Sequence, residues 1–147
     1  MATRTSRTAW NGTIEQGAGE VELTSSGKGT FDVSWPRRTS EGADGVTSPE
    51  ELLAAAHTSC FAMQFAAMIG EEGGTPQSLE IKADVAFGPD PAGGFHVQGI
   101  TLDVSGEVEG IDAETFRRLA EGAKEQCPIS KALTGVEITL GEVRFQG

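Results

Sequence analysis

Hydrophobic and polar residues alternate along the early part of the chain, between Gly19 and Trp35. The apolar positions of this stretch are Val21, Leu23, Phe31, Val33 and Trp35. Because alternate residues of a strand face the same side of a sheet, the pattern predicts two strands. Residues 25–29, rich in serine and glycine, predict the turn of a hairpin between them. The polar segment from Arg37 to Thr47 has no period, and we expect a loop there.

A long apolar helix is predicted to follow this loop. Ser48 is a typical N-cap, Pro49 suits the first helical position, and Glu51 stands where it completes a capping box. We expect the helix to continue to about Ile69 and to end at Gly70. Its residues are apolar or small on every side, which predicts a helix in the core that allows close packing on both sides.

The second half of the chain is predicted to contain two long strands, two helices and a last strand. Strands are expected at 79–87 and 95–108, joined by the hairpin turn GPDPAGG. A helix with Asp112 as its N-cap is expected to stop before Cys127, and a short helix begins at Pro128. The inner face of the longer helix is Phe116, Leu119 and Ala123. The segment 136–145 alternates as a strand.

These elements predict an α+β fold in which antiparallel sheets pack on a long central hydrophobic helix. The 147 residues contain 37% hydrophobic and 22% charged residues, the ordinary range for one globular domain. The sequence contains no repeat or linker, so we expect a single domain over 1–147.

The charge balance excludes two classes of function. The chain has 22 acidic and 11 basic residues and a formal net charge of -11, so it has no electrostatic basis for binding nucleic acid or an anionic membrane surface. The amino terminus carries Arg4 and Arg7 but no apolar run, and the apolar stretch from Cys60 to Ile69 is shorter than the ~20 residues that span a bilayer. We therefore expect a cytoplasmic protein without a membrane partner.

The two cysteines are the main candidates for chemistry, because structural disulfides are rare in the cytoplasm. Cys60 lies three residues after His57 and four before Gln64, so the three side chains share one face of the predicted helix. An inert apolar face rarely places these residue types together. A cysteine on an apolar helix is also a common core residue, and this alternative stays open.

Cys127 lies directly before Pro128, where the free N–H groups at the start of a short helix favour a thiolate. The alternative is a buried cysteine beside a turn proline. Two distant thiols in a chain without a CxxC motif favour a reversible disulfide pair. A zinc site would need Cys60, Cys127, His57 and His96, every cysteine and histidine present, without close-paired spacing. We therefore expect no metal.

The segment SPEELLAAAHTSCF, together with QCPIS near the C-terminus, resembles the signature of the OsmC/Ohr family, the osmotically inducible protein C and organic hydroperoxide resistance proteins. The resemblance covers essentially the whole chain, and the histidine in the first segment resembles the OsmC branch. It implies an intertwined homodimer with active sites between subunits. It also implies a thiol-dependent peroxidase that acts on organic hydroperoxides, and more weakly on hydrogen peroxide, in defence against oxidative or osmotic stress.

The resemblance further implies roles for individual residues. Cys60 corresponds to the peroxidatic thiol, Cys127 to the resolving thiol and Glu50 to the acid of the PEE motif. A catalytic arginine is expected before the central helix, where Arg37 and Arg38 are both candidates. We favour Arg37, because it continues the alternate positions of the preceding strand. His57 and Gln64 are further candidates for the site.

These groups suit the reduction of a hydroperoxide. A thiolate attacks the peroxide, the resulting sulfenic acid condenses with the second thiol, and an external thiol reductant, a small dithiol or a lipoylated protein, restores both thiols. No cofactor is expected besides the cysteine pair. An apolar wall for the substrate has five candidates: Trp35, Phe61, Met63, Phe65 and Met68.

Helix geometry adds a prediction about assembly. Glu50 and Cys60 are ten residues apart, which is ~15 Å along an unbroken helix, too far for one arginine to bridge. We therefore expect Glu50 to act with the Cys60 of a second subunit. The alternative function is a non-enzymatic OsmC-like protein that binds small apolar ligands.

Overall fold

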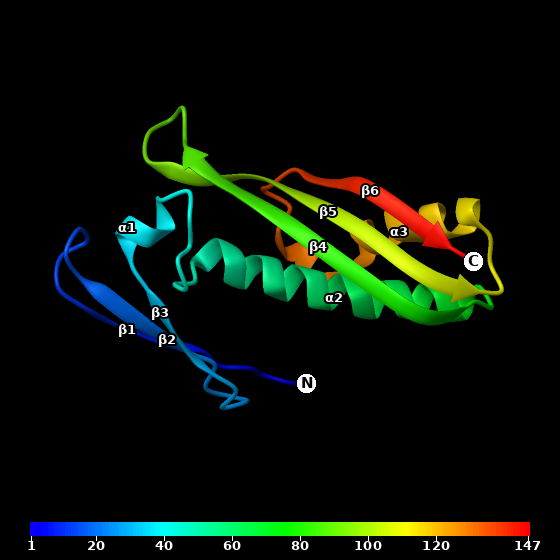
Figure 1. Cartoon of the computed structure of the whole chain (residues 1–147), viewed down its shortest axis with the longest axis horizontal. Coiled ribbons are helices and arrows are strands. Elements are labelled where there is room, and N and C mark those ends of the chain that lie inside the picture. The colour runs from blue at the N-terminus through cyan, green and yellow to red at the C-terminus, as the bar shows by residue number, and fades with distance from the viewer. The chain divides into compact units, whose positions relative to one another are not determined.

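The computed structural model describes residues 1–147, which form two compact units, Met1–Leu52 and Leu53–Gly147 (Figure 1). In chain order the elements are β1 (Arg7–Asn11), β2 (Ala18–Glu22), β3 (Thr30–Val33), α1 (Trp35–Arg38), α2 (Pro49–Glu71), β4 (Thr75–Pro89), β5 (Phe95–Glu109), α3 (Ala113–Gln126), α4 (Pro128–Ala132) and β6 (Ile138–Gln146). Helix α2 begins in the first unit and continues through the second. The sequence predicts one domain over residues 1–147.

The first unit contains a three-stranded antiparallel sheet in the order β1-β2-β3. The predicted hairpin of β2 and β3 is confirmed, and the N–H of Leu23 donates to the carbonyl of Gly29 across its turn at 3.0 Å. Strand β1 was not predicted. All five of its residues are exposed, so its sequence carries no alternation between buried and exposed positions that a pattern could reveal.

The segment after β3 differs from the prediction. The strand ends at Val33, and the next residues form the short helix α1 instead of continuing the strand and entering a loop. Ser34 caps this helix, because its hydroxyl accepts the N–H of Arg37 at 3.4 Å, and Pro36 fits the first turn. The alternation that favoured Arg37 over its neighbour therefore does not extend to that residue.

Helix α2 confirms the long predicted helix, although it ends at Glu71 and not at Gly70. Its N-cap is also confirmed, since the Ser48 hydroxyl accepts the N–H of Glu51 at 3.2 Å. The second half of the capping box is absent. The Glu51 carboxylate accepts a hydrogen bond from the Thr47 hydroxyl instead.

The second unit contains a sheet in the order β4-β5-β6. The predicted hairpin of β4 and β5 is confirmed, with both strands longer than expected. Strand β6 pairs with β5 in parallel, so the prediction of purely antiparallel sheets is wrong for this pair. Parallel neighbours need a crossover connection, and here α3 and α4 provide it. The N-cap of α3 is confirmed, because the Asp112 carboxylate accepts the N–H of Thr115 at 2.8 Å.

One face of α2 packs against this sheet and against α3 (Figure 1). The buried core consists of Phe61, Phe65, Ile69, Ile100, Leu102, Val104, Val108, Phe116, Leu119, Ala120 and Ala123. The ring of Phe116 contacts Phe65 edge-on at 5.0 Å between centroids and lies 5.2 Å from Phe145 of β6. This packing fixes α2 and α3 on the same sheet, and burial of each large side chain contributes about 1.5–3 kcal/mol.

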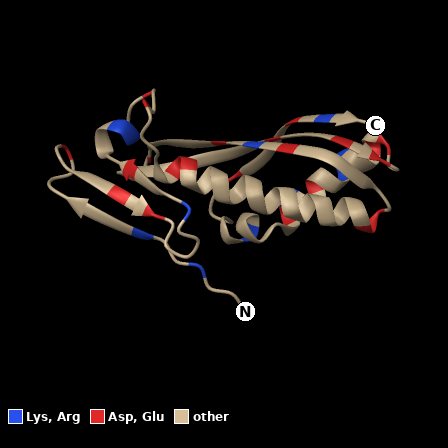
Figure 2. Ribbon diagram, turned by 60° about the horizontal axis from the view of Figure 1, so that its bottom comes forward, with Lys and Arg blue, Asp and Glu red and all other residues tan.

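The opposite face of α2 is exposed, so the prediction of a helix buried on every side is wrong for the single chain. Its exposed residues include Ala55, Ser59, Met63 and Ala67, and Met63 keeps 73% of its surface. Figure 2 shows charged residues only toward the two ends of α2. By length and composition alone the helix could cross a bilayer, contrary to our expectation from residues 60–69. Core helices of globular proteins satisfy the same criterion.

The core can be tested by truncating one aromatic ring. We expect Phe65→Ala to lower the free energy of unfolding by about 3–5 kcal/mol, because the cavity is enclosed on all sides. Phe95→Ala is the matched control, since Phe95 keeps 54% of its surface and stacks on Phe87, a contact worth up to about 1.5 kcal/mol. Urea unfolding measures both. Equal losses in the two variants would contradict this description of the core.

Candidate active site

The two cysteines lie side by side in the second unit, although 67 residues separate them in the sequence. Cys60 is half-buried on α2, and Cys127 is fully buried between the end of α3 and the start of α4. Their sulfur atoms are 2.9 Å apart and both thiols are free. The structure thus brings the two predicted thiols together, in a position where a small movement allows a sulfur–sulfur bond.

The surroundings of Cys60 do not by themselves favour its thiolate. Burial raises the pKa of the Cys60 thiol, and the neighbouring Cys127 raises it further, whereas the N–H of Ile129 lowers it. None of these groups is a cation. For the Cys60 thiol to ionise readily at neutral pH, a positively charged group must therefore lie beside it, in addition to Cys127 and the N–H of Ile129.

The first unit contains a partly buried ion pair between Arg38 and Glu50. The Nη2 of Arg38 is 2.7 Å from Oε1 of Glu50, and its Nε is 3.2 Å from both carboxylate oxygens. Glu50 is buried, and the guanidinium carbon of Arg38 lies 5.9 Å from the ring centroid of Trp35. The carboxylate therefore fixes the plane of the guanidinium at two of its nitrogens.

Arg37, which the sequence analysis favoured, is placed differently. Its guanidinium is exposed and forms an ion pair with Asp44 of the following loop. The difference follows from α1, because consecutive residues of a helical turn point in different directions and only Arg38 is directed at Glu50. The choice of Arg37 as the partner of Glu50 is wrong in this structure.

His57, a further candidate on α2, is completely buried. Its Nε2 lies 2.7 Å from the hydroxyl of Ser130 on α4, and its Nδ1 is buried without a hydrogen-bond partner. Burial lowers the pKa of this imidazole, so the neutral form predominates at neutral pH. Gln64 is half-buried, and no hydrogen bond links its side chain to either thiol.

Ser130 was not predicted as a site residue. A signal was present, because Ser130 follows Cys127 by three residues in the QCPIS segment, just as Cys60 follows His57 by three. The equal spacing allows two pairs of contacts between one face of α2 and one face of α4.

The apolar wall that the sequence suggested does not form in the single chain. Phe61 and Phe65 are buried in the core, whereas Met63 is exposed on the opposite face of α2. The structure also does not gather the four residues that a zinc site would use, since His96 lies at the β4–β5 hairpin with its Nδ1 3.4 Å from Asp90.

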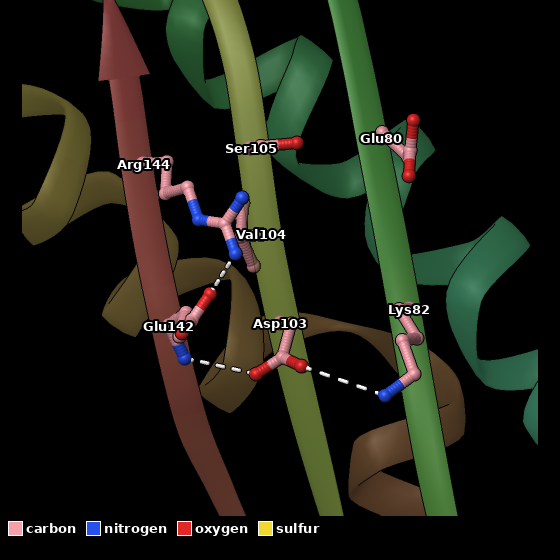
Figure 3. A pocket seen from close by; sticks show the side chains of 7 residues that line it. All are labelled: Glu80, Lys82, Asp103, Val104, Ser105, Glu142 and Arg144. Carbon is pink, nitrogen blue, oxygen red and sulfur yellow. Dashed lines mark hydrogen bonds and ion pairs between the residues drawn. The ribbon is translucent and has the colours of Figure 1, made fainter.

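A polar pocket lies on the sheet of the second unit (Figure 3), and neither cysteine lines it. It is lined by Glu80, Lys82, Asp103, Val104, Ser105, Glu142 and Arg144. The Asp103 carboxylate accepts the N–H of Glu142 at 2.8 Å, at the bulge where the register of β5 and β6 shifts, and Lys82 lies 3.8 Å from it. The Asp103 carboxylate thus replaces a backbone hydrogen bond that the bulge interrupts. The polar side chains of the pocket therefore have a structural role in the sheet.

Known proteins resemble the chain over most of its length. The model of the OsmC-like protein family matches residues 42–141. The chain is 41% identical over 131 residues to peroxiredoxin OsmC of Escherichia coli, a match that covers 89% of each protein. It is 36% identical over 108 residues to the organic hydroperoxide resistance protein OhrB of Bacillus subtilis, covering 71% of this chain and 74% of OhrB. The crystal structure of that OhrB superposes with a TM-score of 0.73 at 30% identity, over 95% of this chain and 97% of the other.

The sulfur contact predicts rapid formation of one specific disulfide. Mild oxidation of the reduced protein with diamide is expected to link Cys60 to Cys127 within each chain, because the two sulfur atoms already lie 2.9 Å apart. Peptide mapping by mass spectrometry under non-reducing conditions identifies the linkage. A protein that forms only disulfides between chains, or keeps both thiols, would contradict the observed geometry.

Proposed function

Because the chain belongs to the OsmC-like protein family, we propose that it is a thiol-dependent peroxidase that reduces organic hydroperoxides, and more weakly hydrogen peroxide. The single observation that carries the proposal is the 2.9 Å contact between Cys60 and Cys127. Its similarity to a peroxiredoxin and to hydroperoxide resistance proteins supports the same reaction class. The higher identity and coverage with OsmC than with OhrB agree with the OsmC branch.

The reaction proceeds in three steps: attack on the peroxide, formation of the disulfide, and reduction of the disulfide. The Cys60 thiolate attacks the outer peroxide oxygen, so a sulfur–oxygen bond forms, the oxygen–oxygen bond breaks and an alcohol leaves after taking up a proton. The thiol of Cys127 then attacks the Cys60 sulfenic acid, which forms the disulfide and releases water. An external thiol reductant, a small dithiol or a lipoylated protein, exchanges with the disulfide and restores both thiols. The cysteine pair acts without a further cofactor.

Arg38 supplies the positive charge that this chemistry needs. A guanidinium beside the Cys60 sulfur lowers the pKa of the thiol and stabilises the charge that develops on the departing oxygen. The pairing of Arg38 with the buried Glu50 supports this role, since it holds the guanidinium in one orientation. Arg37 is unsuited to the role because Asp44 already engages it at the surface.

We propose that two copies of the chain form the active site together. Glu50 and Cys60 lie ten positions apart on the continuous helix α2, about 15 Å along its axis. The Arg38–Glu50 pair of one chain would then activate Cys60 of the other. The exposed, uncharged face of α2, with its alanines and Met63, supports close approach of a second copy.

The remaining expectations follow from this function. A cytoplasmic location suits thiols that are kept reduced between turnovers, and a role in defence against oxidative or osmotic stress suits the substrate. No observation favours the non-enzymatic alternative, because Phe61 and Phe65, two of the apolar side chains considered for a binding wall, lie in the core.

Substitution of each cysteine separates the two thiol roles. We expect Cys60→Ser to abolish consumption of cumene hydroperoxide in the presence of a dithiol, because the attacking sulfur is gone. Cys127→Ser should still reduce about one equivalent and then accumulate oxidised Cys60, since no second thiol resolves the sulfenic acid. Stopped-flow consumption and intact-protein mass spectrometry measure both. Undiminished turnover by Cys60→Ser would refute the peroxidase proposal and favour a binding function.

The arginine assignment predicts unequal effects of two neighbouring substitutions. We expect Arg38→Ala to lower kcat/KM by about 10²–10³ and to shift the rise of activity toward higher pH. The direction follows from the pKa of Cys60, which burial already raises and which the lost guanidinium no longer lowers. Arg37→Ala is the matched control and should change kcat/KM by less than about threefold. A larger loss in Arg37→Ala than in Arg38→Ala would overturn the assignment.

A further inference from the structure

Three contacts join α2 to α4 and its N-cap Cys127, and one of them does not involve a reacting sulfur atom. Cys60 meets Cys127 at 2.9 Å, and three residues along each segment His57 meets Ser130 at 2.7 Å. The N–H of Ile129 is also directed at the Cys60 sulfur. The histidine–serine pair therefore lies one helical turn from the sulfur pair on both sides.

The histidine–serine pair is buried in an otherwise apolar region. His57 has no exposed surface and Ser130 keeps 6%. The proton of the imidazole is assigned to Nε2, because Nδ1 has no partner and a buried N–H without an acceptor costs more than a bare lone pair. The Nε2 proton is then donated to the Ser130 hydroxyl. His57 thus engages Ser130 and makes no hydrogen bond to the Cys60 sulfur that would allow direct proton transfer.

Helix α4 depends on such contacts for its position. It has only five residues, far fewer than an isolated helix needs for stability in water, and its N-cap Cys127 makes no side-chain capping hydrogen bond. Ser130 is the buried residue of α4, and its side chain is polar, so the hydrogen bond to His57 contributes strongly to the attachment of α4 to α2.

We propose that His57 and Ser130 are positioning residues for the resolving step of the peroxidase cycle. Their hydrogen bond holds the start of α4 against α2 and so keeps the Cys127 sulfur within bonding reach of Cys60 after Cys60 has been oxidised. The inference rests on the proposed function, because it presupposes a Cys60 sulfenic acid. It adds a role to two residues that do not touch the hydroperoxide.

Loss of the hydrogen bond between His57 and Ser130 would change the competition between two reactions of the Cys60 sulfenic acid, resolution and overoxidation. In resolution, the Cys127 thiol attacks the Cys60 sulfur, the disulfide forms and water leaves. In overoxidation, a second hydroperoxide transfers an oxygen atom to the same sulfur, which becomes a sulfinic acid while the hydroperoxide becomes an alcohol. Loosening α4 slows the first route and leaves the second unchanged. The protein is then inactivated at a lower dose of hydroperoxide.

The test compares Ser130→Ala with wild-type protein, with Ser130→Thr as the conservative rescue. Thr58→Ala is the matched control, because the Thr58 hydroxyl bonds only to the backbone of its own helix. Full-length protein is cycled with dithiothreitol and increasing cumene hydroperoxide, and the sulfinic acid at Cys60 is quantified by mass spectrometry. We expect half-maximal overoxidation of Ser130→Ala at a dose about fivefold to tenfold lower, the equivalent of one lost hydrogen bond. Ser130→Thr and Thr58→Ala should stay within about twofold of wild type.

A second series keeps the outcome decisive if Ser130→Ala folds poorly. His57→Leu should show the same sensitivity, and the double variant should be no more sensitive than either single one, because all three lose the same contact. The rate of the first attack on hydroperoxide should fall by less than about threefold in every variant. The variants weaken at most the contact of the Ile129 N–H with the Cys60 sulfur. Lower melting temperatures with a wild-type overoxidation dose would overturn the positioning role. Absence of hydroperoxide consumption by the wild-type protein would instead refute the proposed function.

Discussion

The contact between two sulfur atoms at the junction of α2 and α4 is the feature on which the chemistry depends. Cys60 is held by a helix whose inner face, with Phe61 and Phe65, is locked into the core of the second unit. Cys127 directly follows α3, and Phe116 packs α3 into the same core. Because one core fixes both elements, the sulfur atoms of two residues far apart in the sequence lie 2.9 Å apart without a covalent link.

Electrostatics explains why this contact is insufficient alone. Burial keeps the Cys60 sulfur away from water and raises the pKa of its thiol, so it needs a fixed cation. We propose that the Arg38 guanidinium, held by the buried carboxylate of Glu50, is this cation. The spacing of Glu50 and Cys60, ten residues or about 15 Å along α2, is the reason for proposing a site shared by two chains.

Local signals predicted much of this structure. The caps Ser48 and Asp112 located two helices, because a side chain that accepts a free N–H is recognisable from sequence. The cysteines were identified by their context. Arg37 was favoured over Arg38, which forms the ion pair with Glu50, because strand alternation was extended past Val33, where Ser34 and Pro36 start a helical turn. The parallel pairing of β6 was missed because periodicity says nothing about strand direction, and Ser130 because its role depends on a long-range contact.

We propose that hydroperoxide reduction and formation of the Cys60–Cys127 disulfide are one coupled reaction. The most direct measurement adds one equivalent of cumene hydroperoxide per chain to fully reduced protein, without reductant, and quantifies alcohol, thiols and disulfide together. We expect one molecule of alcohol and one Cys60–Cys127 disulfide for each chain, with both thiols lost. Alcohol formed while the thiols persist, or no alcohol from correctly folded protein, would contradict it.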